Sequence, residues 1–337
     1  MGENGQGKTN LLSSIYWLST LTPLRTRKPK ELVQWKESAC SVMGRVELRG
    51  LTHELLVGYK DGKKYHQREG RAVRNRDYFG ALTVVSFTPS DLDLVRGAPE
   101  LRRRFLDRAI FNQHPAHLEV VLNYQRALDA RNRLIREQAA DSLLRAYEET
   151  LADLGARLMQ LRARYLQAIA PVFTTTLYNM CHFAGTVSYK PAISITDPLT
   201  TSQEVLRDQL ADYWAQHRAN DRQRGFTVRG PQMDDFQLRL NEQSAKAYAS
   251  QGQQRAFALA LKISQIDLLS ERIGSRPILL LDDVSSEFDR RRSKMLFEYL
   301  SHFDGQVFLT TTHEQHIPAY ERAQLWRVVG GMVTLND

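Results

Sequence analysis

The chain opens with Gly2-Glu3-Asn4-Gly5-Gln6-Gly7-Lys8-Thr9, which fits the phosphate-loop pattern G-x-x-x-x-G-K-[ST]. Glycines at these positions let backbone N–H groups turn inward around phosphate oxygens. Lys8 would reach the β and γ phosphates of a nucleotide, and the Thr9 hydroxyl would ligate Mg²⁺. Residues 10–18 are expected to form a helix whose positive N-terminal end faces the anion. The predicted nucleotide-binding residues are Gly2, Asn4, Gly5, Gly7, Lys8, Thr9 and Asn10.

Two carboxylates follow the apolar run Ile278-Leu279-Leu280-Leu281. Such a run is typical of a parallel strand buried on both faces, and ligands in α/β sheets lie at the carboxyl ends of these strands. Asp282 would hold Mg²⁺, directly or through water, and Asp283 would orient or deprotonate the attacking water. The plainer interpretation is a strand that ends in two solvated acids. Together with the phosphate loop, the pair favours nucleotide hydrolysis, with Asp283 and Lys8 as the catalytic residues.

A third motif, Ser250-Gln251-Gly252-Gln253-Gln254-Arg255, predicts the start of a helix, because Ser250 and Gln253 have the spacing of a capping box. By itself it would be an ordinary capped helix. The order of the motifs, however, resembles that of ABC-type ATPases: a phosphate loop, this segment, the strand with its acids, and then Ser285-Ser286-Glu287-Phe288-Asp289.

The ABC resemblance implies a dimer that ATP holds together. In that family the capped helix binds the γ-phosphate of an ATP held by a second protomer, and hydrolysis releases the two. The resemblance assigns Ser250, Gly252 and Gln253 to the opposing ATP, Ser286 and Asp289 to the D-loop, and Thr311 and Thr312 to the switch, with His313 left open.

More closely, the chain resembles the bacterial RecF family. The similar segments are residues 2–12, 88–95 with 102–107, 124–132, 250–255 and 281–289. The resemblance implies a DNA-repair ATPase with ATP and Mg²⁺ as cofactors, active in the cytoplasm and in the SOS response. Such a protein binds gapped or single-strand-containing DNA as an ATP-dependent dimer and hydrolyses ATP weakly, dependent on DNA. It would support recombinase loading and replication-fork recovery, with RecO and RecR as partners.

The alternation of strands and helices predicts an α/β nucleotide-binding lobe with an inserted helical lobe, and the resemblance to ABC-type ATPases implies that this lobe is an ATPase head of the ABC type. Strand-like segments alternate with helices around the phosphate motifs, whereas an apolar stripe at helical spacing runs from Leu143 to Tyr165. That stripe predicts packing against an earlier helix near residues 118–134, as a short antiparallel hairpin. The expected parts are residues 1–95 and 272–337 for the ATPase lobe and 96–271 for the helical lobe with the capped-helix motif.

Composition gives weaker support. The net charge of +8 and an isoelectric point near 9.5 suggest a polyanionic partner. The candidate DNA contacts are Lys63, Lys64, Arg102, Arg103 and Arg104. No apolar run is long enough to span a membrane, and the two cysteines, Cys40 and Cys181, have no metal-ligand spacing.

Two features leave alternatives open. Only Met1 precedes Gly2, although a phosphate loop needs a strand before it, so we expect Met1 not to be the biological start. An adaptor that kept this fold and lost ATP turnover is the competing interpretation, and the intact Lys8, Thr9 and Asp282 oppose it. In addition, Gln232 and Met233 replace a His and an Arg of the family's pattern, which leaves the role of residues 229–235 open.

Overall fold

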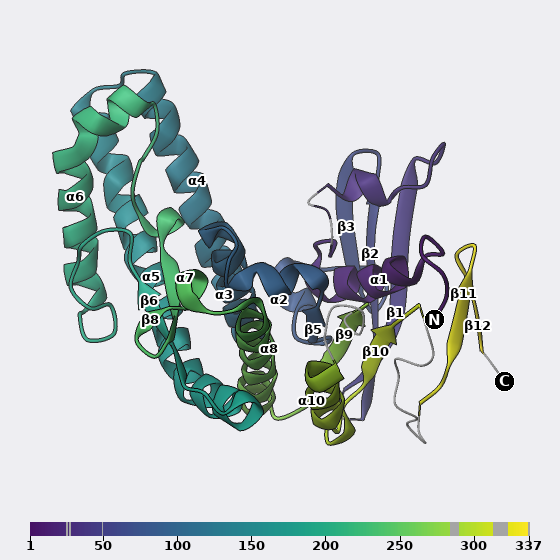
Figure 1. The fold of residues 1–337 in the computed structure, drawn as a ribbon. Helices are drawn as coiled ribbons and strands as arrows, with labels where there is room; N and C mark the ends of the chain where they lie inside the picture. Colours follow the sequence, from purple (N-terminus) through teal and green to yellow (C-terminus); the bar gives the residue numbers. More distant parts are fainter. Residues whose placement is uncertain (25, 27, 49, 284–289, 313–322, 336–337) are drawn as a thin grey trace. The chain divides into compact units, whose positions relative to one another are not determined.

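The computed structural model describes residues 1–337 except 25, 27, 49, 284–289, 313–322 and 336–337. The chain forms two compact units, which are residues 1–92 with 269–337, and residues 93–268 (Figure 1). The boundaries predicted from the sequence lie after residues 95 and 271, and the boundaries between the two units in the structure lie after residues 92 and 268. No helix in the described part of the chain is long and apolar enough to cross a membrane.

The first unit is built on a parallel sheet of three strands in the order β10-β9-β5. The strands are β5 (Val84–Phe87), β9 (Ile278–Asp282) and β10 (Val307–Thr310). Helix α1 (Lys8–Thr20) packs against this sheet through Leu12, Trp17 and Leu18. Because β9 is the central strand, Leu279, Leu280 and Leu281 are 1–4% exposed, and this explains the unbroken apolar run in the sequence.

The same unit carries an antiparallel meander of β1 (Ala39–Leu48), β2 (Leu51–Lys60), β3 (Lys63–Arg68) and β4 (Arg71–Ala72). One face of this sheet buries Leu55 and Val57 in the core around Trp17, while Met43 on the other face is 60% exposed. The β2–β3 turn at Asp61-Gly62 has both residues at positive φ, as a two-residue hairpin turn requires.

The remaining elements of the first unit are short. They are η1 (Pro29–Leu32), α2 (Asn75–Tyr78), α10 (Arg290–Ser301), and the antiparallel pair β11 (Trp326–Val329) and β12 (Met332–Leu335). The chain passes from the first unit to the second within η2 (Pro89–Leu94), and it returns within α8 (Gln251–Ile273).

The second unit is mainly helical. Its elements are α3 (Pro99–Gln113), α4 (His117–Arg136), α5 (Asp141–Cys181), β6 (Gly185–Lys190), α6 (Gln203–Arg224), η3 (Pro231–Met233), β7 (Asp235–Leu240), β8 (Gln243–Ser244), α7 (Ala245–Tyr248) and most of α8. The predicted hairpin is present as α4 and α5. Helix α6 also packs on α5, and its buried apolar stripe is narrow, consisting of Leu206, Leu210 and Trp214.

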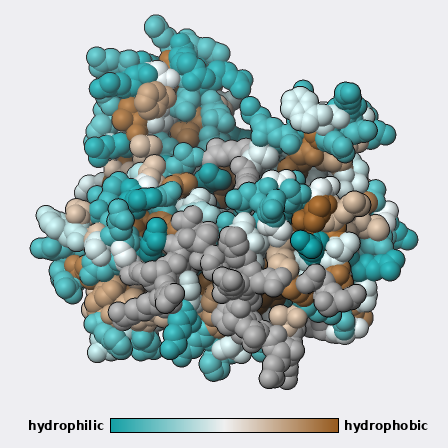
Figure 2. Space-filling view, turned by 45° about the vertical axis from the view of Figure 1, so that its right-hand side comes forward, coloured by the Kyte–Doolittle hydropathy of each residue, from teal (hydrophilic) through white to brown (hydrophobic). Residues whose placement is uncertain are grey.

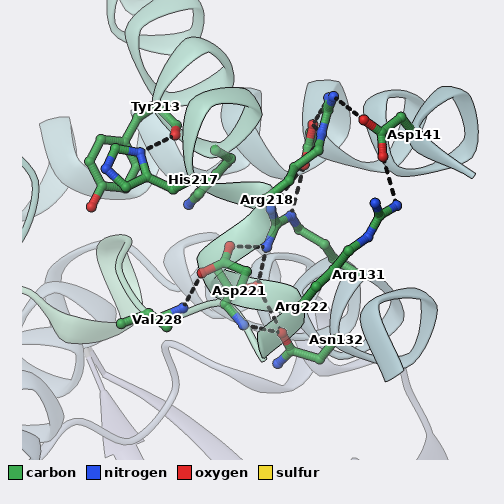
Figure 3. Close-up of polar contacts among 12 residues, drawn as sticks. Arg131, Asn132, Asp141, Tyr213, His217, Arg218, Asp221, Arg222 and Val228 are labelled. Atoms are coloured by element: carbon green, nitrogen blue, oxygen red, sulfur yellow. Dashed lines mark hydrogen bonds and ion pairs between the residues drawn. The ribbon is translucent and has the colours of Figure 1, made fainter. Parts of the chain in front are cut away.

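Polar residues are also used inside the helical unit (Figure 3). Arg131 of α4 is 0% exposed, and its guanidinium donates to Glu148 Oε1 at 2.9 Å and to Asp221 Oδ2 at 2.7 Å. Asp221 also accepts from the backbone N–H of Val228 at 3.0 Å, and Glu148 accepts from Arg218. One buried cation therefore ties α4 to both α5 and α6.

The surface drawn in Figure 2 is mostly hydrophilic with small hydrophobic areas between, as is usual for a globular chain.

We predict that Arg131→Ala lowers the free energy of unfolding by about 3–5 kcal/mol, because it removes the cation that the buried Glu148 and Asp221 share. The measurement is urea unfolding followed by circular dichroism. Arg145→Ala is the matched control, since Arg145 is an exposed arginine of α5, and its effect should stay within about 0.5 kcal/mol. Equal effects of the two substitutions would contradict the structural role of Arg131.

Candidate nucleotide site

The glycine-rich loop before α1 has the backbone of a phosphate cradle. Gly2, Gly5 and Gly7 have φ values of 154°, 80° and 108°, which L side chains rarely adopt. Gly7 is the N-terminal cap of α1, and no side chain caps the helix or places an acid in its first turn. The N–H groups of that turn, which includes Thr9 and Asn10, are therefore those of an uncapped helix start, the kind that accepts a phosphate.

The Lys8 side chain is hydrogen-bonded to the start of the same loop. Lys8 is 7% exposed, and Nζ donates to the carbonyl oxygens of Gly2 at 2.6 Å and Glu3 at 2.9 Å. A buried ammonium inside a ring of backbone groups is a point charge suited to phosphate oxygens. The structure therefore brings together the loop residues that the sequence predicted.

The loop lies against the β11–β12 hairpin, which sequence reasoning did not link to it. Val328 N–H donates to Met1 O at 2.8 Å, and Gly331 N–H donates to Gln6 O at 2.9 Å. A Cβ added at Gly2 would stand 2.4 Å from Val328 O, so only glycine fits there. The Gln6 side chain also accepts from the Gly330 N–H at 2.7 Å. The hairpin thus supports the loop mainly through backbone groups, and backbone contacts leave no residue pattern in the sequence.

Thr9 and Asp282 form the candidate magnesium site. Thr9 Oγ1 donates to Asp282 Oδ1 at 2.8 Å, and Asp282 is 1% exposed. These two oxygens suit Mg²⁺, which usually takes a few protein oxygens and completes its shell with water and phosphate. No cluster of three or more His, Cys, Asp or Glu side chains that could hold a metal occurs among the residues described. The donor set therefore fits Mg²⁺ bound together with a nucleotide.

Thr310 also belongs to this cluster, although the residues predicted from the sequence were the following Thr311 and Thr312. It is 7% exposed, its hydroxyl donates to Asp282 Oδ1 at 3.1 Å, and it accepts from the Asp283 N–H at 3.0 Å. Asp283 has φ 51°, an uncommon value for a residue with a side chain, so this hydrogen bond fixes a strained position. The β9–β10 register pairs Thr310 with Asp282, and aligning the ends of the two predicted strands could have identified it.

The predicted switch residues are only partly described. Thr311 is 1% exposed and Thr312 is half-buried, while His313 lies outside the described residues. Ser286 and Asp289, predicted for the D-loop, also lie outside them.

The capping box at the start of α8 is present as predicted. Ser250 N–H donates to Gln253 Oε1 at 2.9 Å, and Gln253 N–H donates to Ser250 Oγ at 3.2 Å. Gly252 stands between them in the first turn and is half-buried. The motif belongs to the helical unit, whereas the phosphate loop belongs to the other.

The predicted DNA contacts separate into exposed and buried side chains. Lys63, Lys64 and Arg104 are exposed. Arg102 is 6% exposed, and its guanidinium donates to both carboxylate oxygens of Asp235 at 2.7 and 2.9 Å and to the Gly97 carbonyl at 3.0 Å. The prediction of Arg102 as a DNA contact is therefore wrong. Its place on α3 explains this, because it shares a face with the buried Phe105, Leu106 and Ala109.

Arg103 is also engaged within the chain. It is half-buried, and its guanidinium donates to the Asp234 carbonyl at 2.8 Å. Burial lowers the pKa of Arg103, with the Arg162 guanidinium as a further cause. Its prediction as a DNA contact gains no support from this geometry.

The loop at residues 229–235 makes hydrogen bonds to several helices of the helical unit. Trp214 Nε1 donates to the Arg229 carbonyl at 2.8 Å, and Arg162 donates to the Pro231 carbonyl at 2.6 Å. Gln232 accepts from the Tyr124 hydroxyl. Burial raises the pKa of Asp234, although its carboxylate accepts from the backbone N–H of Ala192 at 2.8 Å. The role left open by the sequence is therefore at least structural.

Comparison with known proteins places these features in a family. The RecF/RecN/SMC N terminal domain family matches residues 1–330. The chain is 43% identical to the DNA replication and repair protein RecF of Myxococcus xanthus (strain DK1622) over 317 residues, or 93% of this chain and 83% of that protein. It is 36% identical to the protein of the same name from Geotalea daltonii over 339 residues, or 98% and 92% of the two chains.

Two solved structures give the same result. They are of the recombination mediator protein RecF of the RecFOR pathway, with ATPrS and with ATP, and their TM-scores are 0.91 and 0.90. Each is 29% identical to this chain, and they cover 99% and 100% of it and 90% of their own chains. The predicted α/β ATPase-head fold with an inserted helical lobe is confirmed.

We predict that Thr310→Val lowers the free energy of unfolding by about 1–3 kcal/mol, because the buried Asp282 and the Asp283 N–H both lose this hydrogen-bond partner. Thermal or urea unfolding would measure it. Thr52→Val, an exposed strand threonine of the same unit, serves as the control and should change stability by less than about 0.5 kcal/mol. A Thr310→Val protein as stable as the parent would show that the cluster does not depend on this hydroxyl.

Proposed function

The chain belongs to the RecF family of DNA replication and repair proteins, and from that premise we propose that it is an ATP-hydrolysing DNA clamp. In this proposal two copies close on gapped or single-strand-containing DNA when ATP is bound, and they open after hydrolysis. The observation that carries it is the hydrogen-bonded cluster of Thr9, Asp282 and Thr310 at the phosphate loop.

The loop residues would bind and orient the triphosphate. Backbone N–H groups of the first turn of α1 would face the triphosphate, and the ammonium of Lys8 would supply positive charge to its β and γ phosphates. Mg²⁺ bound at Thr9 and Asp282 would neutralise charge that develops on the phosphate oxygens. This arrangement is the one expected for phosphoryl transfer to water.

Asp283 would orient the attacking water or accept its proton. Its backbone N–H is held by Thr310, the residue paired with Asp282 across the sheet, so the positions of both carboxylates depend on one threonine. Thr311, buried directly after Thr310, is the better placed of the two proposed switch residues to sense this cluster. An adaptor without turnover would not need an ordered pair of acids beside an intact Lys8.

The helix start at Ser250 would complete the site of a second copy. The capping box uses the Ser250 hydroxyl and the Gln253 side chain on the first turn of α8, and Gly252 adds no side chain to that turn. The γ-phosphate held by the opposing protomer would bind here, with Ser286 and Asp289 of the D-loop beside it. ATP would then join the two copies because both surfaces contact the same phosphate.

We predict that Ser250→Arg abolishes ATP-dependent dimerisation while ATP binding by the monomer stays near the parental level. The arginine would place a bulky side chain where the two surfaces meet, and the phosphate loop of the same chain is in the other unit. Sedimentation velocity with ATP and with ADP measures the dimer, and fluorescent-nucleotide binding measures the monomer. Normal ATP-induced dimers in this variant would contradict the proposal.

Two further substitutions serve as controls for that experiment. Asp283→Asn should bind ATP and dimerise but hydrolyse ATP more slowly by a factor of about 10². Lys8→Met should lose ATP binding and with it the dimer, because the loop loses its charge on the phosphates. Parental turnover by Asp283→Asn would remove that carboxylate from the mechanism.

DNA binding would depend mostly on phosphate contacts, in which Lys63, Lys64 and Arg104 are the exposed candidates. Recombinase loading, replication-fork recovery and the partners RecO and RecR follow from the family as proposals for this chain, as does its work in the cytoplasm. The buried Arg102 has no place in this contact set.

We predict that the double charge reversal Lys63→Glu and Arg104→Glu weakens DNA binding and flattens its dependence on salt. Each lost phosphate contact should reduce the slope of log affinity against log salt by about 1. Fluorescence anisotropy over a salt series provides the measurement. Arg207→Glu is the charge-reversal control, because Arg207 lies beside two acids, Asp208 at 2.9 Å and Glu204 at 3.8 Å, where a DNA phosphate would be repelled. A slope equal to the parental one would exclude both residues.

A further inference from the structure

One tryptophan is almost fully exposed. Trp35 is 94% exposed, whereas Trp17 is 2%, Trp214 is 0% and Trp326 is 44% exposed. An indole is the largest apolar side chain, and its surface is ordinarily buried. The preceding Leu32 and Val33 are half-buried, so Trp35 is the exposed apolar side chain of residues 32–38.

The backbone holds Trp35 at the tip of a tight turn. Glu37 N–H donates to Gln34 O at 3.0 Å, which closes the turn around Trp35 and Lys36. Lys36 has φ 75°, in the left-handed region that is unfavourable for a residue with a side chain. Backbone conformations of this kind cost free energy and are found most often at functional sites. Together with the exposed indole, the conformation of Lys36 favours a contact site at this turn.

The fold places this turn beside a group of lysines. Ala39, which starts β1, is paired with Lys60 of β2, and Lys60 is paired with Lys63 of β3. The loop before β1 and the β2–β3 turn therefore lie at the same end of the meander (Figure 1). We call residues 28–37 and 60–64 the Trp35 tip. Its exposed cations are Lys28, Lys30, Lys36, Lys60, Lys63 and Lys64, and its acids are Glu31, Glu37 and Asp61.

We propose that the Trp35 tip binds single-stranded DNA, with the indole stacked on an unpaired base and the lysines on the flanking phosphates. This rests on the proposed DNA-binding function and assigns its single-strand contact to one residue. An aromatic platform among cations is the combination that unpaired strands require, because every base has a π-face while the backbone is polyanionic. Bases in a duplex are already stacked, so the indole would add nothing to duplex binding.

The charges favour nucleic acid over a protein partner. The tip has six lysines against three acids within 28–37 and 60–64, and its one fully exposed large apolar side chain is Trp35. A protein contact of comparable strength normally has a wider apolar centre from which lysine is depleted. Protein docking is nevertheless an alternative that the experiment below detects.

The test compares Trp35→Ala with the parent, using fluorescein-labelled oligo(dT) and a blunt duplex of the same length. We expect the affinity for oligo(dT) to fall by about 5- to 100-fold, the range typical of losing one stacked base, with duplex affinity unchanged. Trp35→Phe should retain most of the affinity because a phenyl ring also stacks. Oligo(dT) should quench part of the parent's tryptophan emission, and this quenching should be absent in Trp35→Phe.

Two controls separate this inference from the proposed function. Leu51→Ala removes another exposed apolar side chain, 65% exposed at the opposite end of the same meander, and should change neither affinity. Lys63→Glu should weaken the binding of both DNAs.

If Trp35→Ala binds oligo(dT) like the parent, or loses affinity equally for both DNAs, the proposed stacking site is wrong while DNA binding stands. A Trp35→Ala protein with changed sedimentation and unchanged DNA affinity would make Trp35 a protein contact. A parent that binds neither DNA would overturn both proposals.

Discussion

The nucleotide site depends on one hydrogen bond, from Thr9 Oγ1 to Asp282 Oδ1 at 2.8 Å. It joins the first helix of the chain to the central strand of the parallel sheet, and Asp282 is almost completely buried. A buried carboxylate has to be hydrogen-bonded, so the bond fixes both partners. The contact brings together the two candidate magnesium ligands and places the end of the phosphate loop beside the strand that carries both acids.

The surroundings of that bond are made largely by backbone groups. The β11–β12 hairpin contacts the loop through N–H and carbonyl groups, and a Cβ at Gly2 would collide with Val328 O. The Thr310 side chain contacts both Asp282 and the Asp283 backbone. Hydrogen bonds from several elements thus converge on the loop and the two acids, and a defined arrangement of groups is what phosphoryl transfer requires of its site.

Charge in this protein has two separate uses. Three arginines of the helical unit, Arg102, Arg131 and Arg162, are buried and bound to carboxylates. They tie helices and loops together and contribute nothing to a surface field. The lysines of the Trp35 tip are exposed instead. The net charge of +8 therefore does not show which cations are buried in ion pairs and which are exposed, and only the burial of each side chain separates these two groups.

The sequence by itself determined the helical hairpin, the phosphate loop and the acids after β9, because each rests on local spacing or on a continuous apolar run. It also determined the ATPase-head fold, through an order of motifs that resembles ABC-type ATPases. It did not determine the inward direction of Arg102, the helix α6 with its narrow apolar stripe, or the part played by Thr310. Those depend on which face of an element is covered and on how strands far apart in the chain align. The exposure of Trp35 is of the same kind: local sequence predicts burial for an indole, and only the turn at the end of the meander carries it into solvent.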